Sequence, residues 1–213
     1  MSFGYIGDTS TSVKQQVKNK GILTTQESFD LQRQGFLGGS LELIVQQSHS
    51  SDVGIVDFLN IKEDVFDVHL LQFFDLATDG TSSNIRLQLY ENGVLETASV
   101  YQRARQFGDT SGTFTEDNTT STDAMTICNY KGSVRTGNGY IYLYNLGNSS
   151  KYSFATFQTL GGHTTDQINF GGAVLPQASK VDGIRILGGS GTTNMTDYNL
   201  KLYGVKQIWV TLD

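Results

Sequence analysis

The stretch 181–205, near the end of the chain, is the feature that most constrains the fold. It holds two runs in which apolar residues alternate with polar or charged ones, separated by a loop rich in Gly, Ser, Thr and Asn. Alternation with period two buries one face of a strand and leaves the other in water. The stretch therefore predicts two strands, joined as a hairpin, that close a sheet built by the preceding chain. The residues expected to close the core are Ile184, Ile186, Leu200 and Leu202.

Upstream segments show the same β character. Asn92-Gly93 predicts a tight hairpin turn, whereas the polar segment 107–123 predicts a long surface loop. No repeat of fixed period and no helical period between strands is visible. Antiparallel sandwiches of about eight strands are most often jelly rolls, so we predict an all-β, antiparallel jelly-roll β-sandwich. The expected strands cover 40–47, 53–59, 65–75, 84–91, 94–106, 140–146, 151–158 and 167–175.

Composition agrees with this fold class. The chain has 24 Gly against 1 Pro, with 10 Tyr and 12 Phe, which supply turns and pleated surfaces. Only 17% of its residues are charged, so its surface depends on Ser, Thr, Asn and Gln. Such a surface favours a protein that packs against copies of itself.

The first part of the chain, 1–39, differs from the body, 40–213. It is polar, with weak helical spacing between Val13 and Val17 and a capping-box pattern that predicts a short helix over 25–34. We predict a mostly non-sheet N-terminal arm that anchors the protein. The alternative is an ordinary segment packed on the sandwich. The expected arm contacts are Tyr5, Ile6, Val13 and Val17.

Charge and hydropathy restrict the partners. A net charge of −6 disfavours nucleic acid, because phosphate contacts need clustered Lys and Arg. The basic runs at Lys14–Lys20 and Arg103–Arg105 are interpreted as local solvated charge. No apolar run approaches the roughly 20 residues of a membrane span, and the first residues lack the features of a signal peptide. We expect folding in a cytoplasm and no membrane partner.

The residues that usually carry chemistry show no catalytic pattern. His49, His69 and His163 lack a second ligand at metal-binding spacing, and no Gly-x-Ser-x-Gly elbow occurs. His69 is predicted to be a satisfied, partly buried histidine. The single cysteine, Cys128, is predicted to be a small buried hydrophobe. We therefore expect no enzyme, no catalytic residue, no cofactor and no metal.

Acidic residues allow weaker alternatives. The segment Asp75–Gly80 and the pair Glu63-Asp64 could attract a calcium ion, but they do not match an EF-hand loop, and a turn explains Asp79-Gly80. Glu116-Asp117 with Asp123 is predicted to be a solvated acidic patch in the 107–123 loop. Paired carboxylates of a glycosidase stay open, because only their separation in space identifies them.

Aromatic residues offer the one candidate interaction surface. Tyr140, Tyr142 and Tyr144 share one face of a strand. We predict that this face packs in the core. The alternative is an exposed ladder that stacks sugars or packs against a neighbouring subunit. His163, in a loop after Gly161-Gly162, is a further candidate contact for a sugar or partner.

Several stretches resemble structural proteins of tailed phages, especially marine and cyanobacterial ones. The closing stretch 181–186 with 198–206 is similar to their C-terminal motif. The segments 145–154 and 171–178 look like the same group, and 4–7 with 19–23 resembles N-terminal segments of tail-fibre and virion proteins. The resemblance implies a β-rich virion component without catalytic residues.

We therefore expect a non-enzymatic virion structural protein, assembled in the host cytoplasm, that decorates or cements the capsid. It would act as a homo-oligomer, with a trimer favoured, and contact other virion proteins through its arm. The alternatives are a tail fibre or adhesin, or a carbohydrate-binding module that recognises host glycans through Tyr140–Tyr144, His163 and the 107–123 loop. A polysaccharide depolymerase ranks third. Capsid versus tail placement, oligomeric state and glycan binding stay open.

Overall fold

The computed structural model describes residues 25–26, 40–49, 51–80, 83–130, 136–162 and 165–206. The chain divides into two compact units, Met1–Leu41 and Glu42–Asp213. In the first unit the described residues are 25–26, which are helical, and 40–41. The predicted arm and the predicted helix over 25–34 therefore lie almost wholly outside the described residues, and both stay predictions.

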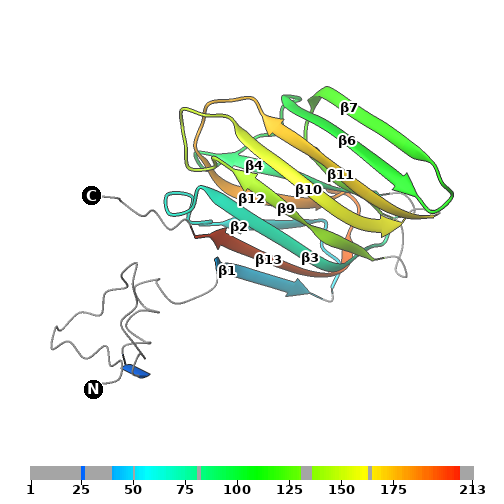
Figure 1. Ribbon diagram of the computed structural model, residues 1–213, viewed down its shortest axis with the longest axis horizontal. Helices are drawn as coiled ribbons and strands as arrows, with labels where there is room; N and C mark the ends of the chain where they lie inside the picture. The colour runs from blue at the N-terminus through cyan, green and yellow to red at the C-terminus, as the bar shows by residue number, and fades with distance from the viewer. Residues whose placement is uncertain are drawn as a thin grey trace, which may run out of the picture. The chain divides into compact units, whose positions relative to one another are not determined.

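The body of the protein is all-β. Its strands form two antiparallel sheets that face each other across one core, as in a β-sandwich (Figure 1). This confirms the prediction of an all-β, antiparallel β-sandwich. The strands are β1 (Leu41–His49), β2 (Ile55–Leu59), β3 (Val68–Thr78), β4 (Ser83–Glu91), β5 (Val94–Leu95), β6 (Tyr101–Asp109), β7 (Phe114–Thr122), β8 (Met125–Tyr130), β9 (Gly137–Tyr144), β10 (Ser153–Gly162), β11 (Asp166–Leu175), β12 (Val181–Gly188) and β13 (Met195–Val205).

Strands from both ends of the body interleave in each sheet. The eight-stranded sheet has the order β1-β13-β3-β9-β10-β11-β6-β7. The five-stranded sheet has the order β2-β12-β4-β5, and β8 also pairs with β4. Consecutive strands such as β1 and β2, β3 and β4, or β12 and β13 lie in opposite sheets, so the chain crosses repeatedly between the two layers.

The alternating residues of the closing stretch lie in the core, as predicted. Ile184 and Ile186 on β12 are 0% and 1% exposed, and Leu200 and Leu202 on β13 are both fully buried. They belong to one cluster that draws apolar side chains from both sheets. Truncating a buried leucine to alanine costs about 2–5 kcal/mol, so these positions contribute strongly to the stability of the sandwich.

The predicted hairpin between these two strands is wrong. β12 lies between β2 and β4, whereas β13 pairs with β3 in the other sheet. Among the described residues, an isolated bridge between Gly188 and Thr193 links the two strand ends. Gly189 and Gly191, with φ of 58° and 87°, help the chain turn from one sheet to the other. Period-two alternation identifies the buried face of a strand but not its neighbour, and both strands face the same core from opposite sides.

The Asn92-Gly93 turn is confirmed, but its return strand is shorter than predicted. Both residues have positive φ, 50° and 80°, as a type I′ turn requires. Only Val94–Leu95 then pairs with β4. The chain next crosses to the eight-stranded sheet at Tyr101, whose side chain is fully buried. The hydroxyl of Tyr101 accepts a hydrogen bond from the backbone nitrogen of Leu89, at 2.9 Å, and so ties the two sheets together.

The segment 107–123, predicted to be a loop, instead completes β6 and forms β7. The two strands pair from Tyr101–Thr122 to Gly108–Phe114. β7 lies at the edge of the eight-stranded sheet and most of its side chains are exposed. An edge strand that buries little of itself needs no apolar alternation, so its sequence carries no strand pattern.

Candidate functional site

The outward face of the eight-stranded sheet carries exposed aromatic side chains on most of its strands. Residues paired across neighbouring strands point to the same side of a sheet, so they form rows. One row has a positive charge at one end, a negative charge at the other and none between. It consists of Lys201, Gln72, Tyr140, Gln158, Phe170, Gln106 and Glu116.

Tyr140, Tyr142 and Tyr144 on β9 form a ladder on this outward face. The ring centroids of Tyr140 and Tyr142 are 5.8 Å apart in a T-shaped arrangement, and those of Tyr142 and Tyr144 are 6.4 Å apart and stacked. The intervening Ile141 and Leu143 are fully buried. The prediction that Tyr140, Tyr142 and Tyr144 pack in the core is therefore wrong. The alternate residues of β9, Ile141 and Leu143, face the core instead.

Hydrogen bonds to β10 hold two of these rings in place. The Tyr140 hydroxyl donates to Gln158 Oε1 at 2.9 Å, and the Tyr144 hydroxyl lies 3.1 Å from Thr156 Oγ1. The strand register brings three more side chains beside the ladder, of which Phe154 is 44% exposed and Leu70 is buried at 4%. We call this set the tyrosine face: Tyr140, Tyr142, Tyr144, Leu70, Phe154 and Tyr203.

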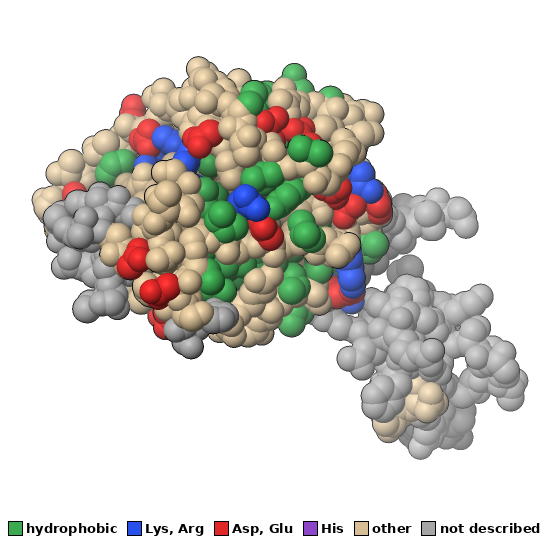
Figure 2. Space-filling view, turned by 180° about the vertical axis from the view of Figure 1, so that it is seen from behind, with side chains coloured by type: hydrophobic (Ala, Val, Ile, Leu, Met, Phe, Trp, Pro, Cys, Tyr) green, Lys and Arg blue, Asp and Glu red, His purple; other side chains and the backbone are tan. Residues whose placement is uncertain are grey.

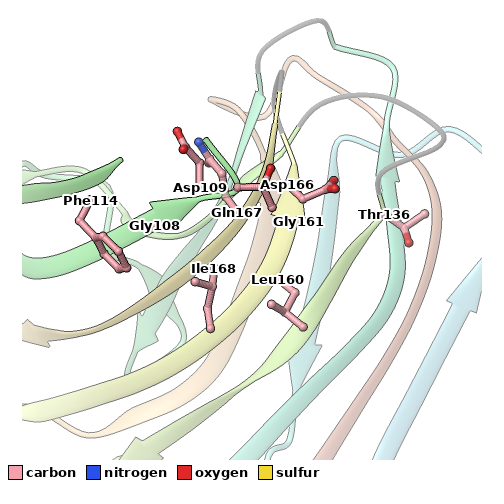
Figure 3. A pocket seen from close by; sticks show the side chains of 10 residues that line it. Gly108, Asp109, Phe114, Thr136, Leu160, Gly161, Asp166, Gln167 and Ile168 are labelled. Atoms are coloured by element: carbon pink, nitrogen blue, oxygen red, sulfur yellow. The ribbon is translucent and has the colours of Figure 1, made fainter. Parts of the chain in front are cut away.

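The same outward face ends in a pocket of about 400 Å³ at the far ends of β6, β10 and β11. We call it the end pocket. Its floor is a second row, Leu160, Ile168, Gly108 and Phe114, which the register aligns across four strands. Figure 3 shows Phe114 on one side, Thr136 on the other, and Asp109, Asp166 and Gln167 gathered at the rim.

Phe114 lies directly over a glycine. A methyl group placed on Gly108 would be 2.7 Å from Cε1 of the Phe114 ring, so only glycine lets the ring rest on the strand. The ring is nevertheless 72% exposed, and Leu160 nearby is 53% exposed. The pocket therefore combines an accessible aromatic ring with a partly apolar floor.

Asp109 is fixed at the pocket rim by its own turn. Its Oδ1 accepts hydrogen bonds from the backbone nitrogen of Ser111 at 2.9 Å and from that of Thr113 at 3.3 Å. The hydrogen bond from the Ser111 hydroxyl is the main cause that lowers the pKa of Asp109; desolvation opposes it, and the two backbone N–H groups lower the pKa further. The carboxylate thus stays charged at neutral pH.

The inward side of β6 and β7 holds a buried ion-pair cluster beside β8. Asp117 lies 2.7 Å from Arg103 Nη2 and 2.6 Å from Arg105 Nη2. Arg105 also donates to Asn169 Oδ1 at 3.2 Å, and its side chain is only 5% exposed. The interpretation of Arg103–Arg105 and Asp117 as solvated charge is therefore wrong.

Burial and pairing oppose each other in this cluster. Burial raises the pKa of Asp117, but hydrogen bonds from Arg105 and Arg103 outweigh it and the net pKa is lowered. At the deeper Arg105, burial outweighs the pairing with Asp117 and lowers the pKa. Arginine nevertheless stays charged at neutral pH, because its ordinary pKa exceeds about 12. Asp123, the other expected member of the acidic patch, instead pairs with Arg86.

The outward face of the five-stranded sheet is more modest. Arg185 on β12 makes two hydrogen bonds to Asp57, at 2.7 and 2.8 Å, and one to the Tyr90 hydroxyl at 2.7 Å. Ile55 and Leu59 on the edge strand β2 are 41% and 57% exposed. Figure 2 shows this side of the molecule, where charged side chains lie among apolar ones. Arg185 and Asp57 neutralise each other, so this surface offers no unpaired charge from these two side chains.

The candidate titratable groups of the core are structural. His69 is fully buried, and its Nε2 donates to the Ile61 carbonyl at 2.9 Å. Burial lowers the pKa of His69 and favours the neutral ring. Cys128 is fully buried, as predicted, and burial raises its pKa to about 11. Its thiol is therefore unsuited to act as a nucleophile.

Several predicted contact residues lie outside the described residues, namely His163 and the arm residues Tyr5, Ile6, Val13 and Val17. Within the described ranges, no group of three or more His, Cys, Asp or Glu side chains is placed to hold a metal ion. Asp79, considered for calcium, instead accepts hydrogen bonds from the backbone and side-chain nitrogens of Asn194, both at 2.9 Å. Across the described residues no helix is long and apolar enough to cross a membrane.

The sequence pointed to the tyrosine ladder and missed the end pocket. Phe114 and Leu160 are isolated apolar residues in polar surroundings, and only the register of three strand pairs brings them together. Phe114 lies in the segment 107–123, for which the sequence predicts a loop, because β7 has no apolar alternation. A weak cue was the single aromatic residue within a run of Thr, Gly, Ser and acidic residues.

Comparisons with known proteins do not identify the chain. No family model matches it, and neither the curated proteins nor the solved structures contain a match. The fold and the chemistry of its surfaces are therefore the basis for a function.

Proposed function

We propose that this chain is a non-enzymatic structural protein of a tailed-phage virion, and that it works as a homo-oligomer whose copies meet through the tyrosine face. Two lines of support converge. The stretches 181–186 and 198–206 resemble the C-terminal motif of such proteins, and they supply β12 and β13 of the sandwich. The tyrosine face is the single observation that carries the assembly role.

The strand order supports a jelly-roll topology, the finer form of the proposed fold. In a jelly roll, early strands pair with late ones in nested order, and consecutive strands alternate between sheets. Here one sheet contains the run β1-β13-β3-β9, and the other contains β2-β12-β4 with β8 beside β4. The strands β6, β7, β10 and β11 extend the first sheet beyond this core arrangement.

The chemistry of the tyrosine face fits a protein contact. Interface cores are enriched in Tyr and other aromatic residues and depleted in charge. Leu70 is paired with Tyr142 on one side and with Tyr203 on the other. The hydrogen bonds of Tyr140 and Tyr144 to β10 hold their rings in place before any partner arrives, which lowers the entropic cost of association.

A substitution on the tyrosine face tests the assembly role. Tyr142→Lys places a charge at its centre, and we expect sedimentation velocity to show a smaller species than for the wild-type protein. The matched control is Leu59→Lys, which changes an exposed apolar residue on the opposite sheet and should leave the sedimentation coefficient unchanged. A wild-type protein that stays monomeric at high micromolar concentration would contradict the assembly role.

We propose capsid decoration or cementing as the placement, with a tail fibre or adhesin as the alternative. Quantitative mass spectrometry of purified particles distinguishes the two by copy number. Hundreds of copies per particle would support the capsid, and a few to a few tens would support the tail. Absence of the chain from particles would overturn the virion proposal itself.

A further inference from the structure

We propose that two copies of this chain pack face to face through the eight-stranded sheet, related by a two-fold axis that runs along β10. The inference rests on the proposed function, in which copies meet through the tyrosine face, and it specifies the surface that the partner presents. The observation that carries it is the row from Lys201 to Glu116, which is complementary to itself when its order is reversed.

β10 is the middle strand of the seven that form this row. On its two sides lie β9 and β11, then β3 and β6, then β13 and β7 (Figure 1). A two-fold axis along β10 therefore places β9 over β11 of the second copy, and β13 over its β7. Each row then lies over the same row of the second copy in reverse order. The match is closest near the axis, because the strands of two facing sheets cross at about 30°.

The two ends of the row carry opposite charges, and these select the direction of the axis. With the axis along β10, Lys201 lies over Glu116 of the second copy, and the symmetry makes this contact twice. An axis along the row would instead place Lys201 over Lys201 and Glu116 over Glu116. Like charges facing each other across an interface cost several kcal/mol, so the row favours the axis along the strand.

The uncharged middle of the row is complementary in the same way. Gln72 lies over Gln106 of the second copy, so that amide meets amide, and Tyr140 lies over Phe170, so that ring meets ring. Gln158, on the axis, faces its own copy. Tyr140 and Phe170 are both 39% exposed, so each ring has surface left to bury against the other.

The neighbouring row is complementary in size. It carries Tyr142 on β9 but Gly172 on β11 and Ala104 on β6, with Thr156 between them on β10. The axis places Tyr142 over Gly172 of the second copy, and Thr156 over its own copy. Side chains of two facing sheets interdigitate within a gap of about 10 Å. The missing side chain at Gly172 therefore leaves room for the tyrosine ring.

The size and symmetry of this face suit a dimer. Its seven strands are 8 to 11 residues long, and at about 4.8 Å between strands they cover roughly 800–900 Å². A standard interface buries about 800 Å² on each partner. A contact that uses the same surface on both copies is isologous and closes as a dimer, whereas a cyclic trimer needs two different surfaces. The self-complementary row thus favours a dimer over the trimer expected from the sequence.

The first test exchanges the charges at the two ends of the row and measures self-association by sedimentation equilibrium. Glu116→Lys alone and Lys201→Glu alone should each raise the dissociation constant at least about tenfold, because each creates two like-charged contacts. The double variant, and an equimolar mixture of the two single variants, should return to within about threefold of the wild-type value. Asp52→Lys makes the same charge change at an exposed position outside these strands and should have no effect.

A cross-linking experiment tests the position of the axis. In Gln158→Cys the two new thiols face each other across the axis, and a short bismaleimide should join the two copies. In Gln106→Cys the thiols lie on strands about 20 Å apart along the sheet, and the same reagent should leave the copies separate. The native Cys128 is fully buried, so it should react in neither variant.

The outcomes separate this inference from the assembly role. A wild-type protein that stays monomeric, or an assembly that survives Tyr142→Lys, would overturn both. The two-fold geometry alone would be overturned if Tyr142→Lys disrupts the assembly but charge reversal does not, or if the mixed variants fail to associate. Cross-linking of Gln106→Cys as readily as Gln158→Cys would also overturn it.

Discussion

Asp117→Asn is the substitution that tests most directly how the extended part of the eight-stranded sheet is stabilised. The change keeps the size of the side chain and removes the charge that pairs with Arg103 and Arg105. Breaking a buried pair leaves an uncompensated charge and costs about 3–5 kcal/mol when both partners are sequestered from water. Arg105 is almost fully buried, but the Asp117 side chain is 29% exposed. Water therefore compensates in part, and we expect a loss of about 2–3 kcal/mol at pH 7.

The pH dependence identifies the charge as the cause. The pKa of Asp117 is lower in the folded protein than in the unfolded chain, where an aspartate titrates near about 3.9. The stabilisation is thus complete above the unfolded pKa and disappears as the pH falls through the folded pKa. The difference in unfolding free energy between wild type and Asp117→Asn should be constant from pH 7 to about pH 5 and shrink below about pH 4. Other carboxylates titrate in both proteins, so their contributions cancel in this difference.

The assay is urea denaturation followed by intrinsic fluorescence at several pH values. The control is Glu116→Gln, which removes the neighbouring carboxylate on the exposed side of β7. Among the described residues, Glu116 accepts a hydrogen bond from the exposed Gln106 side chain, at 3.2 Å, so its loss should cost less than about 0.5 kcal/mol. A difference for Asp117→Asn that stays the same at low pH would refute the electrostatic reasoning, and so would equal losses in the two variants.

Two further predictions concern the interior. In Gly204→Ala, the new methyl group would lie 2.2 Å from Cδ2 of the buried Phe66 ring, so thermal denaturation should show a loss of about 1–3 kcal/mol. Gly137→Ala, whose methyl group would have its nearest neighbour at 3.4 Å, should be much milder, and equal losses would contradict the packing argument. Cys128 is the only cysteine, fully buried and with its pKa raised to about 11, so a thiol reagent at pH 8 should label it only as the protein unfolds in urea. Rapid labelling of the native protein would show that the core opens there.

Local patterns were sufficient to predict the fold class and most strands. Ile184 and Leu202 lie in the core because alternation alone determines which face of a strand is buried. The predicted hairpin between their two strands is wrong, because strand pairing depends on contacts between residues far apart in the sequence. β13 pairs with β3, and β12 pairs with β2 and β4, and neither choice leaves a trace in the local pattern.

The candidate sites divide along the same line. The tyrosine ladder could be predicted because its members share one strand. Its exposure could not, because both faces of β9 carry apolar side chains and only the packing of the two sheets decides which face is buried. The ion pairs of Asp117 and the floor under Phe114 each join side chains from different strands. Exposed edge strands also lack the apolar alternation that marks a strand, so β7 and the surfaces it helps to build could not be recognised from the sequence.

The position of β1 beside β13 has a consequence for the order of events during synthesis. β1 ends at His49 and its partner begins at Met195, so the first strand of the body leaves the ribosome long before its neighbour exists. β3 likewise pairs with β9 and β13, which are synthesised after it. Such distant pairing delays folding, because a large loop must close before any of its contacts form. We therefore expect this half of the sandwich to form only once the last strand has been made, and the nascent chain to need protection of its unpaired strands until then.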